Sequence, residues 1–92
     1  MDDDQFLMRI AYPIQFCKLE SEAVANLERL IVGRQCGLDE GVQFYVSHLS
    51  RILSRDRGSF PEIPLSDFPF GESQMRTLMA ELRDVLSRRN PG

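Results

Sequence analysis

Hydrophobic residues in the second half of the chain recur at the spacing of amphipathic helices. One stretch runs from Asp39 or Glu40 to about Ser54, and its apolar side chains fall on one arc roughly 120° wide. A second stretch, from about Glu72 to Arg88, has an arc of similar width. Each pattern predicts a helix with one buried face. The apolar positions are Val42, Tyr45, Val46, Leu49, Ile52 and Leu53, then Met75, Leu78, Met79, Leu82, Val85 and Leu86.

The first third of the chain carries a helical pattern that a proline interrupts. Apolar residues recur every seven positions, with further apolar residues beside this stripe. Pro13 removes one backbone amide and disfavours helix at Tyr12. We therefore expect a short helix near 4–11, a break, and a longer helix over about 14–33. The stripe consists of Ile10, Cys17, Val24 and Ile31, flanked by Phe16, Leu19, Ala23, Leu27 and Leu30.

Two features of this region leave alternatives open. Residues 5–12 are also compatible with a strand, since their apolar residues suit extended structure. Glu20 falls within the apolar arc of the longer helix. It indicates either a partial break in that helix or a carboxylate at the edge of an interface.

The segment from Asp56 to Gly71 predicts a long loop, because three Pro and two Gly interrupt it. A solvated linker would be polar, yet this one holds five large apolar residues. The loop either closes one side of the bundle by packing on the helices or presents these side chains to a partner. The five residues are Phe60, Ile63, Leu65, Phe68 and Phe70.

These patterns together predict an all-α protein. We expect a small bundle of three main helices plus a short N-terminal helix, with the Pro/Phe-rich loop before the last helix. The 92 residues predict a single helical domain over 1–92. A chain of this length buries only about 60–65% of its unfolded surface, so pairing with a partner or with a second copy would add burial.

Charge and composition narrow the classes of function. The net charge is −3 and the isoelectric point is about 5.0, which disfavours nucleic-acid binding because that activity needs a basic surplus. The acidic start does not resemble a secretory signal, and no apolar run approaches the roughly 18 residues of a membrane span. We expect a cytoplasmic protein. The basic residues are all Arg except Lys18, a bias that we take to indicate a bacterial or phage genome.

Catalytic, cofactor and metal signatures do not emerge from the sequence, and we expect neither an enzyme nor a cofactor. His48 lies on the predicted polar face of its helix, with no nucleophile placed to use it. Cys17 and Cys36, with one His, are too few for a zinc site, and we expect both to be buried, reduced thiols.

A helix-turn-helix over Arg29–Val46 is the alternative function, as a small DNA-binding regulator. The helix–turn–helix rhythm around Gly37 favours it. Asp39 and Glu40 would face phosphate with the wrong sign, and Gln43 falls where the motif normally has a buried aliphatic residue.

The leading hypothesis is a small cytoplasmic protein-binding module that acts by stoichiometric protein–protein interaction. It would be a regulator, an inhibitor, an immunity-type protein or a secretion chaperone, and homodimerisation is compatible with it. Phe44 is a large apolar residue outside the stripe of its helix, and aromatic and Arg side chains are enriched at interfaces. The candidate partner-binding residues are Phe44, His48, Arg51 and Arg55 on one helix face and Phe60, Ile63, Leu65, Phe68 and Phe70 in the loop.

Overall fold

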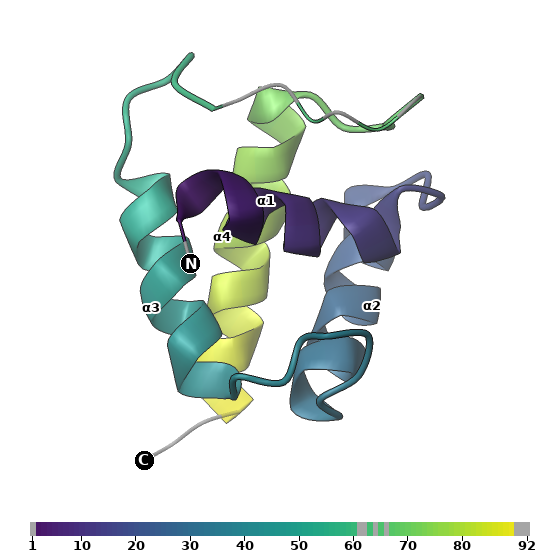
Figure 1. The fold of residues 1–92 in the computed structure, drawn as a ribbon, viewed down its shortest axis with the longest axis vertical. Helices are drawn as coiled ribbons and strands as arrows, with labels where there is room; N and C mark the ends of the chain where they lie inside the picture. Colours follow the sequence, from purple (N-terminus) through teal and green to yellow (C-terminus); the bar gives the residue numbers. More distant parts are fainter. Residues whose placement is uncertain (1, 61–62, 64, 66, 90–92) are drawn as a thin grey trace.

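The computed structural model describes residues 2–60, 63, 65 and 67–89, and its regular structure over these residues is helical throughout, which confirms the all-α prediction. The three longer helices and the short N-terminal helix were all expected. The elements, in chain order, are α1 (Asp3–Ala11), the 3-10 helix η1 (Tyr12–Ile14), α2 (Glu20–Val32), α3 (Val42–Leu53) and α4 (Glu72–Arg89) (Figure 1).

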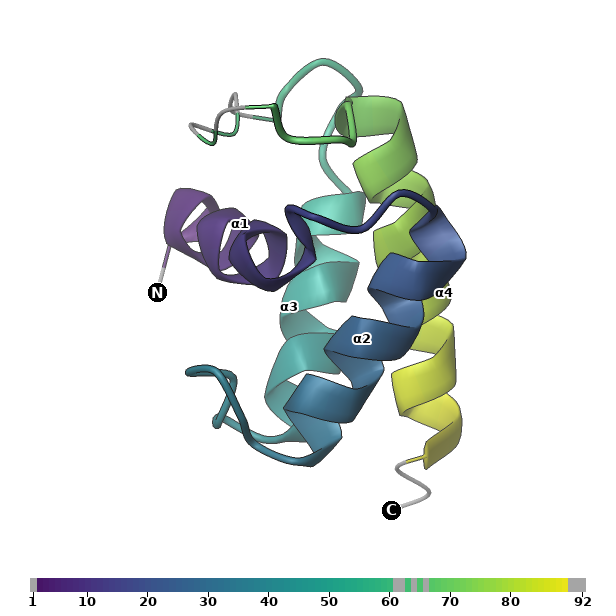
Figure 2. The same ribbon diagram turned by 90° about the vertical axis from the view of Figure 1, so that its right-hand side faces the viewer.

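The helix α4 is the central element of the bundle. It packs along α2 on one side and along α3 on the other. The helix α1 runs crosswise over these three helices, as both ribbon views show (Figures 1 and 2). No helix among the described residues combines the length and the apolar character that crossing a bilayer requires.

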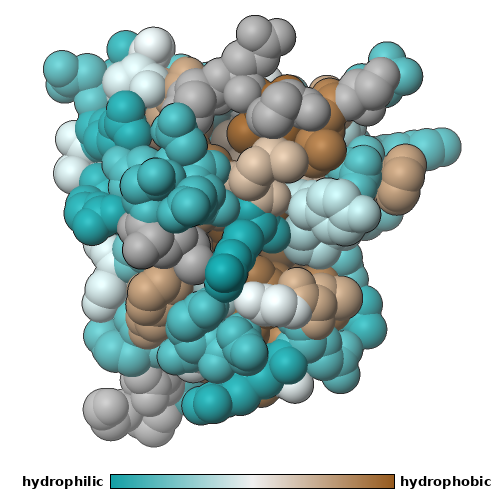
Figure 3. Space-filling model, viewed as in Figure 1, coloured by the Kyte–Doolittle hydropathy of each residue, from teal (hydrophilic) through white to brown (hydrophobic). Residues whose placement is uncertain are grey.

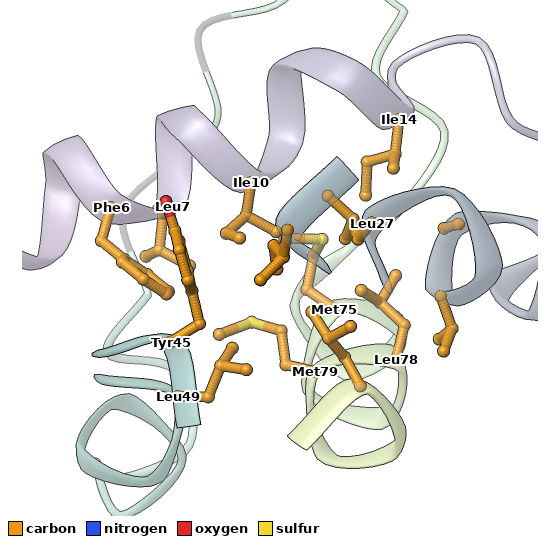
Figure 4. Packing of buried hydrophobic residues seen from close by; sticks show 14 of the residues in the cluster. Phe6, Leu7, Ile10, Ile14, Leu27, Tyr45, Leu49, Met75, Leu78 and Met79 are labelled. Carbon is orange, nitrogen blue, oxygen red and sulfur yellow. The ribbon is translucent and has the colours of Figure 1, made fainter. Parts of the chain in front are cut away.

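The core lies where the crosswise helix meets the three upright ones. Leu7 and Ile10 of α1, Leu27 of α2, Leu49 of α3 and Leu78 of α4 are fully buried, and their side chains converge on one another (Figure 4). Each such side chain contributes about 1.5–3 kcal/mol when it leaves water. The α3 and α4 residues belong to the predicted apolar arcs, so the two clear periodic patterns do face the core.

The N-terminal helix begins with a reciprocal cap. The side chain of Asp2 accepts a hydrogen bond from the amide of Gln5 at 2.8 Å, and the Gln5 side chain accepts one from the amide of Asp2 at 3.1 Å. The helix predicted near 4–11 is therefore confirmed and the strand alternative for residues 5–12 is wrong. At Pro13 the α-helix has ended and the chain tightens into η1, although Tyr12 keeps helical backbone angles (φ −56°, ψ −50°).

The helix predicted over about 14–33 is wrong at its start, because α2 begins only at Glu20. Leu19 adopts an extended conformation (φ −120°, ψ 147°) as the N-cap, so the chain turns away from helix between η1 and α2. Glu20 and Glu22 lie in the first turn, where negative charge is favourable. Glu20 therefore does not mark a partial break within a helix: it is the first residue of α2, and the non-helical residues precede it.

The helix predicted from Asp39 or Glu40 begins later, at Val42. Gly41 is its N-cap, with a φ of 96° that favours glycine. The Glu40 carboxylate instead accepts hydrogen bonds from Tyr45 Oη at 2.5 Å and from Arg9 Nη1 at 2.8 Å. The last helix, expected over Glu72–Arg88, matches α4 to within one residue.

Candidate functional site

The loop between α3 and α4 borders a pocket of about 420 Å³ that is open to solvent and lined mainly by apolar residues, with Asp67 and Glu72 among them. Phe70 is buried against the core, whereas Phe60, Ile63, Leu65 and Phe68 are only half-buried. All five loop residues that the sequence singled out therefore line one pocket. Among the described residues, those that line it are Phe60, Ile63, Leu65, Asp67, Phe68, Phe70, Gly71, Glu72 and Met75.

Polar contacts with the first turn of α4 fix the described start of this loop. The Glu72 carboxylate accepts hydrogen bonds from the amides of Gly58 at 2.7 Å and Phe60 at 3.3 Å, and from Arg76 Nε at 3.0 Å. The Gly58 amide and then Arg76 hold the pKa of Glu72 below its usual value. Arg76 also lies over the Phe60 ring, 4.3 Å from its centroid. Two side chains of α4 thus hold Phe60 in place: Glu72 binds its backbone amide and Arg76 covers its ring.

The apolar residues of the loop pack partly on the core and partly towards solvent. Phe70 anchors the loop in the core, and the Phe68 ring packs edge-on against it with 5.8 Å between ring centroids. The half-buried side chains leave the pocket accessible from solvent. Hydrophobic surface gathers over this loop at the upper right of Figure 3. The loop therefore closes the bundle and also presents an apolar hollow.

A second apolar feature lies at the corner between α1 and α2, where sequence reasoning did not place a site. Tyr12, Phe16 and Leu19 are 63%, 89% and 56% exposed. Phe16 and Leu19 were expected beside the buried stripe of a helix over 14–33. Because α2 starts only at Glu20, these residues lie outside any helix and face solvent. The sequence did contain a signal for this exposure: Pro13 interrupts the helical spacing before Phe16 and Leu19.

The corner and the pocket lie at the same end of the molecule. Gln74, in the first turn of α4, donates a hydrogen bond to Glu20, the first residue of α2, at 3.4 Å. In both ribbon views the connection between η1 and α2 lies just below the loop that precedes α4 (Figures 1 and 2). We call the pocket together with Tyr12, Phe16 and Leu19 the docking end.

The other predicted surface, on α3, is used within the chain. Phe44 is half-buried and packs against the core, and His48 is only 7% exposed, so the expectation of a surface histidine is wrong. The reason is α1: the Phe6 ring stacks on the His48 ring with 4.1 Å between centroids and 7° between planes. The placement of His48 opposite the stripe is wrong: His48 lies beside the buried residues Tyr45 and Ile52 of α3, and α1 covers this flank.

Charge reinforces this contact between α1 and α3. Asp3 accepts hydrogen bonds from Arg51 Nη2 at 2.7 Å and from Arg55 Nη1 at 2.8 Å. These bonds, that from Arg51 first, hold the pKa of Asp3 below its usual value. Burial, followed by the nearby Arg51 charge, lowers the pKa of His48. The neutral His48 ring accepts a hydrogen bond from Arg51 at 2.8 Å. We call Asp3, Phe6, His48, Arg51 and Arg55 the α1 clasp.

The α1 clasp changes the interpretation of the predicted partner-binding face. Its arginines are paired with Asp3, and Arg55 also donates to the carbonyl of Ser59 at 3.0 Å. These side chains link α3 to α1 within the chain, although the Arg51 side chain remains 60% exposed. The structure therefore brings the loop residues into one site, while the α3 residues contact α1 and, through Arg55, the start of the loop.

The cysteine prediction is wrong for Cys36, which is exposed, while Cys17 is half-buried. Burial raises the pKa of the Cys17 thiol. Both are free thiols. Within the described part of the chain, no three His, Cys, Asp or Glu side chains lie close enough together to hold a metal ion.

The geometry between α2 and α3 differs from that of a DNA-binding helix-turn-helix. Residues 33–41 join the two helices, whereas the motif uses a turn of about three or four residues. Gly41 and the buried Leu38 shape this longer connection. Several arginines that could contact phosphate are paired with carboxylates: Arg9 with Glu40, Arg51 and Arg55 with Asp3, and Arg89 with Glu28.

Comparison with protein-family models, with curated proteins and with solved structures found no match to this chain. Function must therefore be inferred from the residues and geometry of the chain itself.

Proposed function

We propose that this protein is a small binding module that occupies a partner protein stoichiometrically through its docking end. The observation that carries the proposal is an apolar pocket of about 420 Å³ at the same end of the molecule as Phe16, which is 89% exposed. An aromatic side chain in that position contributes nothing to the core, and its hydration is unfavourable until a partner covers it.

The composition of the docking end suits a protein interface. Aromatic residues and Met are enriched at interface centres, and anchors that fill pockets dominate binding energy. The docking end supplies both kinds of feature: a protruding ring at Phe16 and a recess floored by Phe70 and Met75. The Glu72 hydrogen bonds to the loop amides pre-order one wall, which lowers the entropic cost of binding.

We further propose that the protein acts in the cytoplasm, because a reducing compartment keeps thiols such as those of Cys17 and Cys36 free. A regulator, an inhibitor, an immunity-type protein and a secretion chaperone all act by such occupation of a partner. The DNA-binding alternative gains no support from the long connection between α2 and α3.

Affinity capture from lysate of cells that express the protein tests the proposal. Wild-type protein, Phe16→Ala and Phe68→Ala would be compared, with and without nuclease. Val32→Ala is the matched control, since Val32 is exposed but belongs to the opposite end of α2. We expect one nuclease-resistant protein near equal stoichiometry, lost with Phe16→Ala and kept with Val32→Ala.

Phe68→Ala tests the pocket side of the same surface. Because Phe68 contacts Phe70, its melting temperature must be measured beside its binding. Loss of capture with little change in melting temperature supports a direct role for the pocket. Recovery of nucleic acid alone, or of partners that nuclease removes, would refute the proposal and favour DNA binding.

A further inference from the structure

The docking end carries a projecting side chain and a recess of matching chemistry. Phe16 exposes 89% of its surface and so does not enter the pocket of its own chain. The pocket is lined mainly by aromatic and aliphatic side chains, including Phe68, Phe70 and Met75. Its volume of about 420 Å³ lies in the range of about 300–1,000 Å³ typical of pockets that enclose small molecules. A phenyl ring is therefore well within its capacity.

The two features lie at one end of the molecule, as the hydrogen bond between Gln74 and Glu20 and both ribbon views show. This arrangement suits a twofold dimer, in which one surface of each copy meets the same surface of the other. A ring that does not occupy the recess of its own chain can enter that of a facing copy. In such a dimer, the Phe16 ring of each copy enters the pocket of the other when the two copies associate.

Charge on the two features is also complementary. Lys18 lies two residues after Phe16 and is exposed, and Asp67 lines the pocket and is exposed. Neither makes an ion pair or side-chain hydrogen bond with another described residue. When Phe16 of one copy enters the pocket of the other, the Lys18 ammonium is carried towards the Asp67 carboxylate. Opposite charges at an interface rim fix orientation and speed association.

We propose that the docking end binds a second copy of this chain, with Phe16 of each copy in the pocket of the other and Lys18 facing Asp67. The inference rests on the docking end of the proposed function and names one occupant for it. A partner protein and the second copy then compete for the same surface, so the dimer is the form that protects Phe16 when no partner is bound.

Sedimentation equilibrium across the micromolar to millimolar range tests the dimer on purified protein under reducing conditions, which exclude disulfide-linked copies. Wild-type protein should show a reversible monomer–dimer equilibrium. Phe16→Ala should weaken dimerisation by at least about 30-fold, because each dimer loses two buried aromatic anchors. Val32→Ala, the exposed control, should dimerise like wild type. A wild-type protein that stays monomeric throughout, or a dimer that Phe16→Ala leaves unchanged, would overturn the proposal.

Charge reversal tests the geometry of the dimer. Lys18→Glu and Asp67→Lys should each weaken association, and the double variant should restore it, because the charges then match again. Asp67 has a φ of 57°, which favours Asp or Asn, so Asp67→Asn is the control for an effect on the loop. It should weaken dimerisation less than Asp67→Lys. If the double variant dimerises no more tightly than the single variants, Lys18 of one copy does not face Asp67 of the other.

Different experimental results would refute the dimer and the proposed function. A monomeric wild-type protein that still captures a partner through Phe16 would refute the dimer alone. A reversible dimer from which no other protein can be captured would refute the proposed function and leave the second copy as the occupant of the docking end.

Discussion

Phe6 and Phe16 lie in the first part of the same chain, yet one is fully buried and the other is almost fully exposed. Phe6 belongs to a helix that is capped by Asp2 and Gln5, and its ring stacks on His48 of α3. Phe16 follows Pro13, beyond the point where the helical register ends. The comparison teaches that helical spacing indicates burial only while the helix that carries it continues.

The same contrast separates two regions of the molecule. In the core and the α1 clasp, apolar and charged groups contact one another within the chain, so substitutions there should act on stability. At the docking end, Tyr12, Phe16 and Leu19 face solvent, so substitutions of these three residues should act on association and leave the fold intact. Four predictions test this division, from the largest expected effect on stability to the smallest.

The largest effect is expected in the core. Leu78 is fully buried at the centre of α4, where α2 and α3 both pack. Leu78→Ala should lower the free energy of unfolding by about 2–5 kcal/mol, because it removes buried methyl groups and leaves a cavity. Urea unfolding followed by circular dichroism measures this. A loss no larger than that of an exposed-site control such as Val32→Ala would contradict the assigned core.

A smaller effect is expected in the α1 clasp. Asp3→Asn keeps the shape of the side chain but removes the charge that pairs with Arg51 and Arg55. We expect a loss of about 1–2 kcal/mol, because charge-assisted hydrogen bonds are replaced by weaker ones. Asp4→Asn is the matched control, since Asp4 lies in the same helical turn but is exposed. Equal losses for the two variants would show that only the helix dipole is involved.

Acid should weaken the same contact through His48. Burial and Arg51 lower the pKa of His48 in the folded protein, so the unfolded chain binds the proton more readily. The stability that this provides is fully present above the usual histidine pKa of about 6.5 and is lost as the pH falls through the lowered folded-state value. Asp3, whose pKa is also lowered, adds a further loss below about pH 4.

Unfolding measured between pH 7 and pH 5 checks the contribution of His48. Wild-type stability should fall over this range, and His48→Gln, although less stable at pH 7, should show a flatter slope. Parallel slopes for the two proteins would mean that His48 does not titrate differently in the folded and unfolded states.

The smallest effect on stability is expected at Phe16. Phe16→Ala should change the free energy of unfolding by no more than about 0.5 kcal/mol, as for other exposed positions. The same urea titration measures it, at low protein concentration so that association does not contribute. A loss of the size expected for Leu78→Ala would place Phe16 in the core and remove it from the docking end.

The sequence predicted α4 closely because its pattern is local and uninterrupted. Glu72 starts the helix directly after Gly71, and no Pro or Gly occurs before the end of the helix. The start of α2 was missed because Cys17 continues the seven-residue spacing although the chain there is not helical. Spacing alone does not distinguish a helix from a turn that happens to preserve its rhythm.

The candidate site was only partly predictable for a different reason. The loop residues from Phe60 to Phe70 stood out because large apolar side chains are unusual between Pro and Gly, and these residues do line one pocket. The exposure of Phe16 and the burial of His48 depend on where α1 lies, which is a tertiary contact. The periodicity of a single helix carries no information about which other helix covers its second face.

Affinity capture with Phe16→Ala beside wild-type protein and Val32→Ala, each with nuclease, tests the central claim most directly. The account predicts one nuclease-resistant protein bound by wild type and by Val32→Ala and absent with Phe16→Ala, at an unchanged melting temperature. Equal recovery of that protein by all three forms, or recovery of nucleic acid alone, would contradict the assignment of the docking end as a protein-binding surface.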